Sequence, residues 1–286
     1  MDLDGKVAIV TGASRGVGAA TALALARAGC RVACAARSTA DQPQRTPGTL
    51  DDTVERVREA GGQAVAVPTD LAKEDDVLGM VAATVEQLGR VDVLVNNAAI
   101  TFVGDLDIAM KRHDLIMDVN LRAPLLAIRE AKGHMIRQGG GAILNVSSVA
   151  AFFPHPGLMS YGASKIALER LTLDAAVQLG PHGIAVNCFR IDVPVASEGF
   201  VANTPGMDRS DWEPPETAAE GILWMLSQPL SYSGRRESMY GLRQREGIMA
   251  SRAAREWKGD PPPTRLLDGM PEVGESAFRE PYDQRP

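Results

Sequence analysis

The chain has 286 residues, of which 45% are hydrophobic, and this size and composition suit one large globular domain. A formal charge of -6 and a pI near 5.3 do not supply the basic field that attracts nucleic acid or anionic membranes, so we expect neither as a partner. No apolar run approaches the roughly 18 residues that span a bilayer, and the opening MDLDGK lacks the basic and apolar regions of a secretion signal.

Short apolar runs of strand length alternate with longer segments of helical period along the chain. The expected strands are KVAIVT, RVACAA, AVAVP, VDVLVNN, GAILNVSS and IAVNCF, with a seventh near 238–242. The expected helices cover 16–28, 50–60, 74–88, 107–133, 161–179 and 215–226. This alternation predicts an α/β fold in which a doubly wound, seven-stranded parallel sheet carries helices on both faces.

Two segments depart from this alternation. Residues 37–48 contain Pro43 and Pro47 and exceed the length usual for such a connection, which predicts an inserted loop. From residue 258 onward the chain holds six of its 18 prolines among scattered charges of both signs, a composition that cannot bury a core. We therefore predict one domain over 1–257 and a Pro-rich C-terminal extension over 258–286 that packs across a neighbouring subunit or stays disordered.

The cysteines and histidines indicate neither disulfides nor a metal. Cys30, Cys34 and Cys188 are odd in number, lie in apolar stretches and lack the paired spacing of a zinc site or a disulfide framework. The histidines show no ligand spacing. We expect no metal, reduced thiols in the core, and a cytoplasmic protein.

The first strand runs directly into TGASRGVG, in which Gly12, Gly16 and Gly18 open a tight turn into a helix. Glycines at such a turn let the backbone approach a pyrophosphate, whose charge is favoured at the helix N-terminus. An ordinary strand-to-helix turn is the simpler alternative. The position after the first strand of a βαβ unit favours a dinucleotide, and with it a Rossmann fold.

Two arginines indicate which dinucleotide binds. An acidic residue commonly ends the second strand of NAD-selective sites, but Ala36 stands at that place here. Arg37 follows at once and Arg15 lies within the glycine turn, so two guanidinium groups could converge on a 2′-phosphate. This predicts NADP, with NADPH preferred over NADH, although both arginines could instead be solvated surface charges.

Asp70 ends the third strand in VPTDLA, where its carboxylate could accept from the adenine amino group, with Leu71 contributing its backbone. A role for Asp70 as a helix N-cap is equally physical and compatible with the first.

A tyrosine and a lysine lie four residues apart in YGASK, which places Tyr161 and Lys165 on one face of a helix. A tyrosine titrates near pH 10, so as a base at neutral pH it needs a nearby cation, which Lys165 can supply. Ser148 ends the fifth strand at the carboxyl edge of the sheet, where its hydroxyl could hold a substrate oxygen during proton transfer.

Taken together, TGASRGVG, Asp70, NNAA at 96–99, Asn120, Ser148 and YGASK resemble the short-chain dehydrogenase/reductase family over roughly residues 5–245. The resemblance implies that Ser148 orients the substrate and that Tyr161 is the acid/base. It also implies that Lys165 binds the ribose and lowers the tyrosine pKa, and that Asn120 holds a water linking Lys165 to solvent. The cofactor contacts that we expect are Gly12, Ser14, Arg15, Gly16, Val17, Gly18, Arg37, Ser38, Asp70, Leu71, Asn97, Ala98, Tyr161, Lys165 and Val193.

The sequence departs from the family pattern in two places. NNAA replaces the more usual NNAG, and Ile191 with Asp192 stands where the family places Pro-Gly beside the nicotinamide. Asp192 could orient a hydroxyl-bearing substrate or cap the helix of a lid, which we expect over 198–215. The inserted loop and its CAARS start loosely resemble a hydroxysteroid-dehydrogenase-like branch of the family.

The substrate wall should come from the segments after the fourth, fifth and sixth strands. They supply Thr101, Phe102, Phe152, Phe153, His155, Met159, Val193, Phe200 and Trp212, which predicts a largely apolar pocket. Phe152 and Phe153 could equally be core residues, and a loop histidine such as His155 is more often structural or solvated.

These features favour an NADP(H)-dependent oxidoreductase that transfers a hydride between nicotinamide and a carbonyl or secondary alcohol. One alternative is a catalytically silent NADPH-binding regulatory protein, which would have no need of a proton-transfer tyrosine. Another is an enoyl reductase or epimerase, which in this family usually departs from the serine and Tyr-x-x-x-Lys arrangement. The resemblance also implies a homodimer or homotetramer paired through helices around 115–131 and 163–179.

Overall fold

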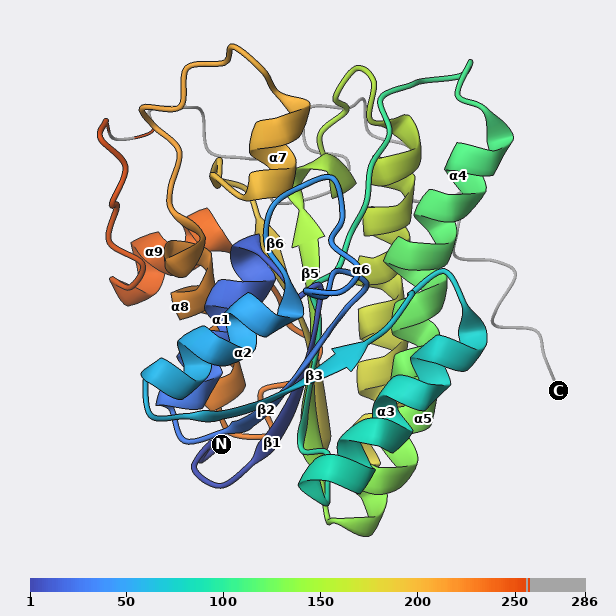
Figure 1. The fold of residues 1–286 in the computed structure, drawn as a ribbon, viewed down its shortest axis with the longest axis vertical. Helices are drawn as coiled ribbons and strands as arrows, with labels where there is room; N and C mark the ends of the chain where they lie inside the picture. Colours follow the sequence, from blue (N-terminus) through green and yellow to red (C-terminus); the bar gives the residue numbers. More distant parts are fainter. Residues whose placement is uncertain (256, 258–286) are drawn as a thin grey trace, which may run out of the picture.

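The computed structural model describes residues 1–255 and 257, and its centre is a parallel sheet of seven strands in the order β3-β2-β1-β4-β5-β6-β7 (Figure 1). Every neighbouring pair is parallel, as predicted. The strands are β1 (Val7–Thr11), β2 (Arg31–Ala36), β3 (Gln63–Pro68), β4 (Val93–Asn96), β5 (Gly141–Ser148), β6 (Ile184–Ile191) and β7 (Arg236–Ser238). The strand order reverses between β1 and β4, which is where open sheets of this kind bind ligands.

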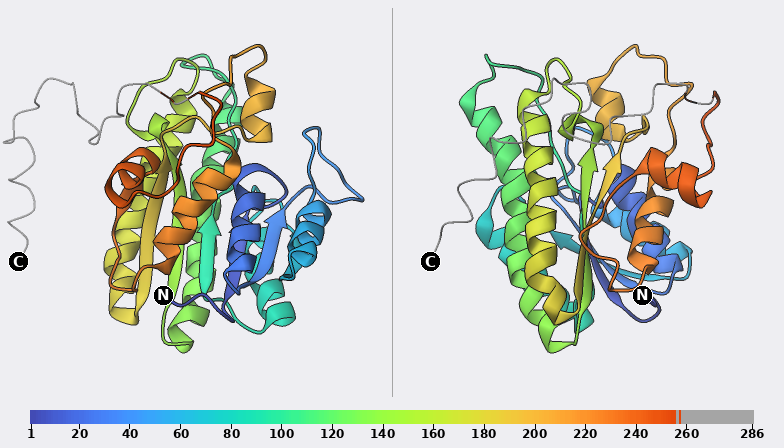
Figure 2. Two further views of the ribbon diagram at one scale, coloured as in Figure 1. Left: turned by 90° about the vertical axis from the view of Figure 1, so that its left-hand side faces the viewer. Right: turned by 180° about the vertical axis from the view of Figure 1, so that it is seen from behind.

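Helices cover both faces of the sheet (Figures 1 and 2). One layer holds α1 (Gly16–Arg27), α2 (Leu50–Glu59), α8 (Pro215–Ser227) and α9 (Met239–Glu246), and the other holds α3 (Glu74–Leu88), α5 (Ala123–Arg137) and α6 (Met159–Leu179). Successive strand residues enter opposite cores because side chains alternate along a strand, so that Ile9 packs under the second layer and Val10 under the first. The predicted doubly wound fold is confirmed.

Two predicted elements differ in the structure. The predicted helix 107–133 is a rod of three pieces, namely α4 (Met110–Met117), one π-helical turn (Asp118–Arg122) and α5. The predicted seventh strand is present, but its predicted bounds of 238–242 are wrong, because β7 ends at Ser238 and residues 239–242 are helical. The Ser238 hydroxyl accepts from the amide of Gly241 at 2.9 Å, an N-cap that starts α9 at that point.

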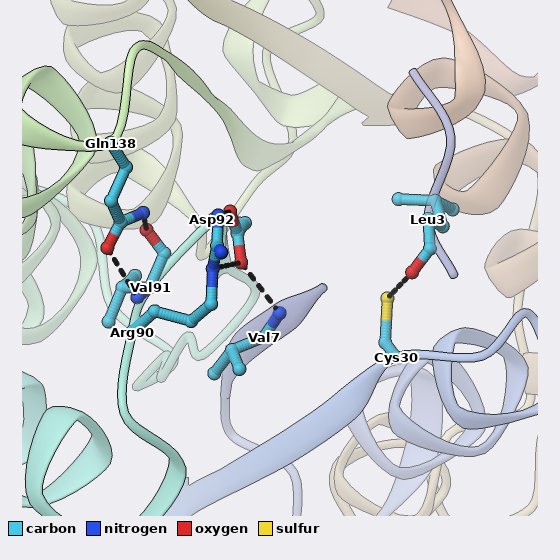
Figure 3. A network of polar contacts seen from close by, with 7 residues as sticks. All are labelled: Leu3, Val7, Cys30, Arg90, Val91, Asp92 and Gln138. Atoms are coloured by element: carbon cyan, nitrogen blue, oxygen red, sulfur yellow. Dashed lines mark hydrogen bonds and ion pairs between the residues drawn. The ribbon is translucent and has the colours of Figure 1, made fainter. Parts of the chain in front are cut away.

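A polar network closes the amino end of the sheet (Figure 3). Asp92, just before β4, accepts from the Val7 amide at 2.9 Å and from Arg90 Nε and Nη2 at 2.8 and 2.6 Å. Gln138 pairs with both backbone groups of Val91. These bonds satisfy polar groups at the edge opposite the glycine turn, so we assign them to stability.

The remaining fold predictions concern the cysteines, the membrane and the C-terminus. Cys30, Cys34 and Cys188 are buried free thiols, as predicted. Among the described residues no helix is long and apolar enough to cross a membrane. Trp257 packs edge-on against Tyr240 of α9, with 6.0 Å between ring centroids, and the predicted extension 258–286 lies outside the described residues.

Candidate active site

The glycine turn after β1 is packed so closely that side chains are excluded. Gly12 has φ +70°, and a Cβ there would lie 2.9 Å from the Cα of Ala98. A Cβ on Gly18 would collide with the carbonyl oxygen of Gly12. Asn97 Nδ2 donates to the Thr11 carbonyl at 2.8 Å and joins the ends of β1 and β4. The turn therefore offers bare backbone at the start of α1, as a pyrophosphate requires.

Arg15 lies between this turn and the inserted segment. Its Nη2 donates to the Gly48 carbonyl at 2.9 Å, while its Nε is buried and has no hydrogen-bond partner among the described residues. Ser38 is buried and its hydroxyl donates to the same carbonyl at 2.8 Å, so it holds the loop. Arg37 is exposed at the end of β2. The exposed guanidinium of Arg37 and the incompletely paired one of Arg15 therefore flank the place where an adenine ribose would lie.

The short helix α7 (Glu198–Asn203) approaches the same turn from the far side of the site. A Cβ on Gly16, whose φ is +55°, would lie 3.0 Å from Ser197 Cβ and 3.3 Å from Glu198 Oε2. Burial lowers the pKa of Arg15, the negative charge of Glu198 opposes that shift, and Arg37 adds to it. A carboxylate thus shares the space beside the glycine turn with two guanidinium groups.

The other predicted cofactor residues in this half of the sheet are either buried or part of the turn after β3. Ser14 and Val17 are buried within the turn and α1. Asp70 and Leu71 follow β3, and Asp70 Oδ1 accepts from the Ala72 amide at 3.2 Å. This closes a turn before α3 rather than capping it, because α3 begins at Glu74 and the residue at its N-cap is Lys73. The predicted N-cap role of Asp70 is therefore wrong, and its second carboxylate oxygen lies 3.9 Å from Lys73 Nζ.

The predicted acid/base residues meet at the carboxyl end of β5. Lys165, on α6, is 2% exposed and its Nζ donates to the Val146 carbonyl of β5 at 2.8 Å. The same Nζ lies 5.6 Å from the centroid of the Tyr161 ring, one helical turn earlier. The Ser148 hydroxyl accepts from the Ala150 amide at 3.3 Å, which begins a 3-10 turn and aligns the serine with Tyr161.

Burial governs the protonation of both groups. It raises the pKa of Tyr161, and a hydrogen bond with Ser148 acts in the opposite direction. It lowers the pKa of Lys165 to about 8, a shift that Cys188 and Glu169 oppose. The resemblance implied that Lys165 lowers the pKa of Tyr161, whereas in this structure burial outweighs the hydrogen bond with Ser148 and the pKa of Tyr161 is raised.

Asn120 lies in the π-helical turn between α4 and α5, a distortion that often marks functional positions. Its Oδ1 accepts from the Ile100 amide at 2.8 Å, and its Nδ2 donates to the Ile100 carbonyl and the Ser164 hydroxyl, both at 3.0 Å. Ser164 in turn donates to the Tyr161 carbonyl at 2.7 Å. Asn120 thus joins the loop after β4 to α6 through Ser164, a link that no residue pattern predicted.

The predicted substrate wall divides into exposed and packed residues. Phe153 is half exposed, whereas Phe152 is buried beneath Arg190, whose guanidinium carbon lies 3.9 Å from the ring centroid. Phe200 of α7 stacks on buried Trp212 with 4.6 Å between centroids. The other predicted members follow the same strands: Thr101 and Phe102 after β4, His155 after β5 with Met159 at the start of α6, and buried Val193 after β6.

Asp192 serves as a helix cap. Its Oδ1 accepts from the amide of Tyr240 at 2.8 Å, at the first turn of α9. Its Oδ2 is buried without a hydrogen-bond partner among the described residues, and burial raises its pKa although Tyr240, Ser238 and Arg190 act against that shift. The helix capped is α9, not the predicted lid.

The edge of the sheet therefore combines bare backbone at the start of α1 with Ser148 at the end of β5 and with Tyr161 and Lys165 on α6. The described residues contain no group of three or more side chains arranged to hold a metal ion. The glycine packing and the unpartnered Nε of Arg15 fit a dinucleotide with phosphate groups on this turn.

Comparisons with known proteins agree with this reading. A family model described as short chain dehydrogenase matches residues 6–193. A 3-oxoacyl-[acyl-carrier-protein] reductase of Synechocystis sp. is 37% identical over 243 residues, covering 84% of this chain and 87% of that protein.

Two solved structures bound to NADP are similar across the fold. A short chain dehydrogenase of Burkholderia cenocepacia superposes with a TM-score of 0.73 at 30% identity, covering 83% of this chain and 97% of that one. A metagenomic short-chain oxidoreductase superposes with a TM-score of 0.69 at 30% identity, covering 83% and 99%.

Proposed function

Because this chain belongs to the short-chain dehydrogenase/reductase family of NAD(P)-dependent oxidoreductases, we propose that it interconverts a carbonyl and a secondary alcohol with NADP(H), with Tyr161 as the acid/base. The observation that carries this proposal is the meeting of Ser148, Tyr161 and buried Lys165 at the end of β5. A bound nicotinamide would supply or accept the hydride. The chain's own residues would hold the substrate and move the proton.

In the reductive direction, Ser148 would donate a hydrogen bond to the carbonyl oxygen and Tyr161 would deliver its phenolic proton there. The raised pKa of Tyr161 favours this direction, since the phenol is neutral and ready to donate. Lys165 would stabilise the phenolate that remains, with one N–H committed to Val146 and two left for the ribose and a water. Asn120 would hold that water and so link Lys165 to solvent.

NADPH is proposed over NADH because the adenine end is cationic. Arg37 is exposed at the end of β2, and it is close enough to Arg15 across the turn that its charge lowers the pKa of Arg15. A 2′-phosphate would give both guanidinium groups a charge-assisted partner. Gly12, Gly16, Gly18, Asn97 and Ala98 would supply the backbone around the pyrophosphate and nicotinamide ribose.

An apolar substrate is proposed from the rim of the site. Segments after β4, β5 and β6, at the top of Figure 1, expose large apolar side chains, and these are Val103, Leu106, Met110, Phe153, Met159, Phe200 and Met207. A hydrogen bond joins the segments after β4 and β5, because Asp105 accepts from the Gly157 amide at 2.8 Å. Exposed apolar groups gathered around an entrance are typical of sites that bind apolar ligands. We also propose a homo-oligomer, since Leu125, Ile136 and Val177 are exposed on α5 and α6.

The test is the fall in nicotinamide absorbance when the protein is mixed with NADPH and a panel of apolar ketones, acyl thioesters and steroids. Turnover by the natural chain and loss of at least about 100-fold in Tyr161→Phe would support the proposal. NADPH binding without turnover in either direction, across the panel and the matching alcohols, would favour a silent nucleotide-binding protein instead.

A further inference from the structure

An ion pair is buried next to the proposed proton-transfer residues. Glu169 is fully buried on α6, one helical turn beyond Lys165 and on the same face. Arg190, near the end of β6, donates from Nε and Nη2 to the two carboxylate oxygens, each at 2.9 Å. Arg236, in β7, lies 3.7 Å from one of these oxygens and is partly exposed.

The pair joins several segments of the site. The Arg190 guanidinium carbon lies 3.9 Å above the Phe152 ring, and the Arg236 guanidinium carbon lies 5.9 Å from the same centroid. Phe152 follows Ser148 by one short turn. The cluster thus holds the end of β5, the middle of α6 and the end of β6 in one arrangement, which the bidentate geometry makes rigid.

Stability alone gives weak grounds for retaining such a pair. Two charges removed from water are costly, and replacing a buried ion pair with apolar side chains is often neutral or stabilising. The neighbouring Lys165 is different, because its ammonium is itself buried and is held only by the Val146 carbonyl among the bonds seen here. Burial favours the neutral amine, and a nearby anion favours the ammonium.

Glu169 is the acidic residue placed to raise the pKa of Lys165. The groups that oppose the lowered pKa of Lys165 are Cys188 of β6 and Glu169. Burial raises the pKa of the Cys188 thiol far above its ordinary value, so that thiol is neutral at physiological pH. Arg190 binds the carboxylate from β6, whereas Lys165 lies one turn before Glu169 on the same face of α6, so the two cations belong to different elements.

We propose that Glu169 is a positioning residue whose carboxylate, oriented by Arg190, maintains the charge of the Lys165 ammonium during proton transfer at Tyr161. The role in catalysis rests on the proposed function, because it requires proton transfer at Tyr161. The electrostatic link itself can be measured without turnover.

The kinetic test is the pH profile of ketone reduction with NADPH. Loss of the Lys165 proton ends activity at high pH, so Glu169→Gln should move the alkaline limb of kcat to lower pH by about half a unit or more. Glu169→Asp retains the charge and should keep the limb near its natural position even if its melting temperature falls. Arg236→Gln removes a competing cation and should move the limb in the opposite direction.

The direct test follows the Lys165 side-chain carbons by NMR in selectively labelled full-length protein, with Lys165→Arg used to assign the resonance among the six lysines. A lower Lys165 titration midpoint in Glu169→Gln than in the natural chain would support the proposal. An unchanged midpoint and an unchanged alkaline limb, with only a lower melting temperature, would overturn it. If no substrate is turned over, the proposed function fails and the NMR midpoint still decides the link.

Discussion

Arg15 Nη2 donates to the carbonyl oxygen of Gly48 at 2.9 Å, and this bond joins the glycine turn to the last part of the inserted segment. The two residues lie 33 positions apart in sequence. A Cβ on Gly48, whose φ is +103°, would meet the Ser14 carbonyl and the Arg15 side chain, so the segment closes directly on the turn. The inserted loop is therefore a wall of the proposed adenine site.

Because Arg15 has this structural bond and Arg37 is exposed, their substitutions should differ. Arg37→Asp should raise KM for NADPH by about 10-fold or more while changing KM for NADH little, since only the 2′-phosphate interaction is lost. Steady-state kinetics with both cofactors measures the ratio. Equal effects on the two would refute the assignment of NADP preference, and Arg15→Met should impair both cofactors because the wall itself loosens.

Glu198 should oppose cofactor binding, because its carboxylate lies beside Gly16 where phosphate charge would accumulate. We expect Glu198→Gln to tighten NADPH binding by about two- to fivefold, most visibly at low ionic strength. Quenching of protein fluorescence during NADPH titration gives the dissociation constants. Glu86 is exposed on α3, away from the site, so Glu86→Gln makes the same charge change and should leave NADPH binding unchanged. Weaker binding by the Glu198 variant would instead indicate a supporting role.

Lys165 should cost stability while it serves catalysis. Its pKa of about 8 in the folded protein lies below the ordinary lysine value, so the unfolded chain binds more protons between these values and stability rises with pH there. Lys165→Met should abolish turnover yet raise the free energy of unfolding at pH 7 by about 1–3 kcal/mol. Urea unfolding at pH 7 and pH 9 measures both the gain and its decline. Lys132→Met, at an exposed position, is the matched control, and a destabilised Lys165→Met would contradict the argument.

Replacing Asp192 with asparagine should leave the protein as stable as the natural chain or more so. Burial raises the pKa of Asp192, so the folded protein binds more protons above the ordinary aspartate value and stability falls as pH rises through that window. Asp192→Asn keeps an acceptor for the Tyr240 amide and should match or exceed the natural chain at pH 7. Asp192→Gly removes the acceptor of the Tyr240 amide, leaves Ser238 as the remaining cap of α9, and should cost about 1–2 kcal/mol. Chemical unfolding of the two variants separates the cap from the charge, and equal losses in both would exclude this account.

Local patterns predicted most of the architecture. Apolar runs and helical periods placed six of the seven strands and the major helices because each is decided by the side chains of its own residues. The exception is 238–242, where the residues suited a strand but a serine cap began a helix against β6. The glycine turn and YGASK could also be predicted, because the spacing of the glycines sets the turn and the four-residue step places Tyr161 and Lys165 on one helix face.

Other parts of the site could not be predicted, because they depend on contacts between distant segments. The link from Asn120 to Ser164 requires the π-helical turn, which no residue pattern announced. Ser38, expected at the cofactor, donates to Gly48, 10 positions on. The predicted cytoplasmic location and the predicted subunit pairing stay predictions.

The sequence by itself determined the order of elements, the alternation that makes a parallel sheet, and the residues able to exchange a proton at its carboxyl edge. Only the tertiary structure decided that Arg190 of β6 pairs with buried Glu169, that Glu198 lies beside Gly16, and that Asp192 accepts from the first turn of α9. Periodicity and turn chemistry act within a few residues, whereas the protonation of a buried group depends on burial and on charges that only packing brings together.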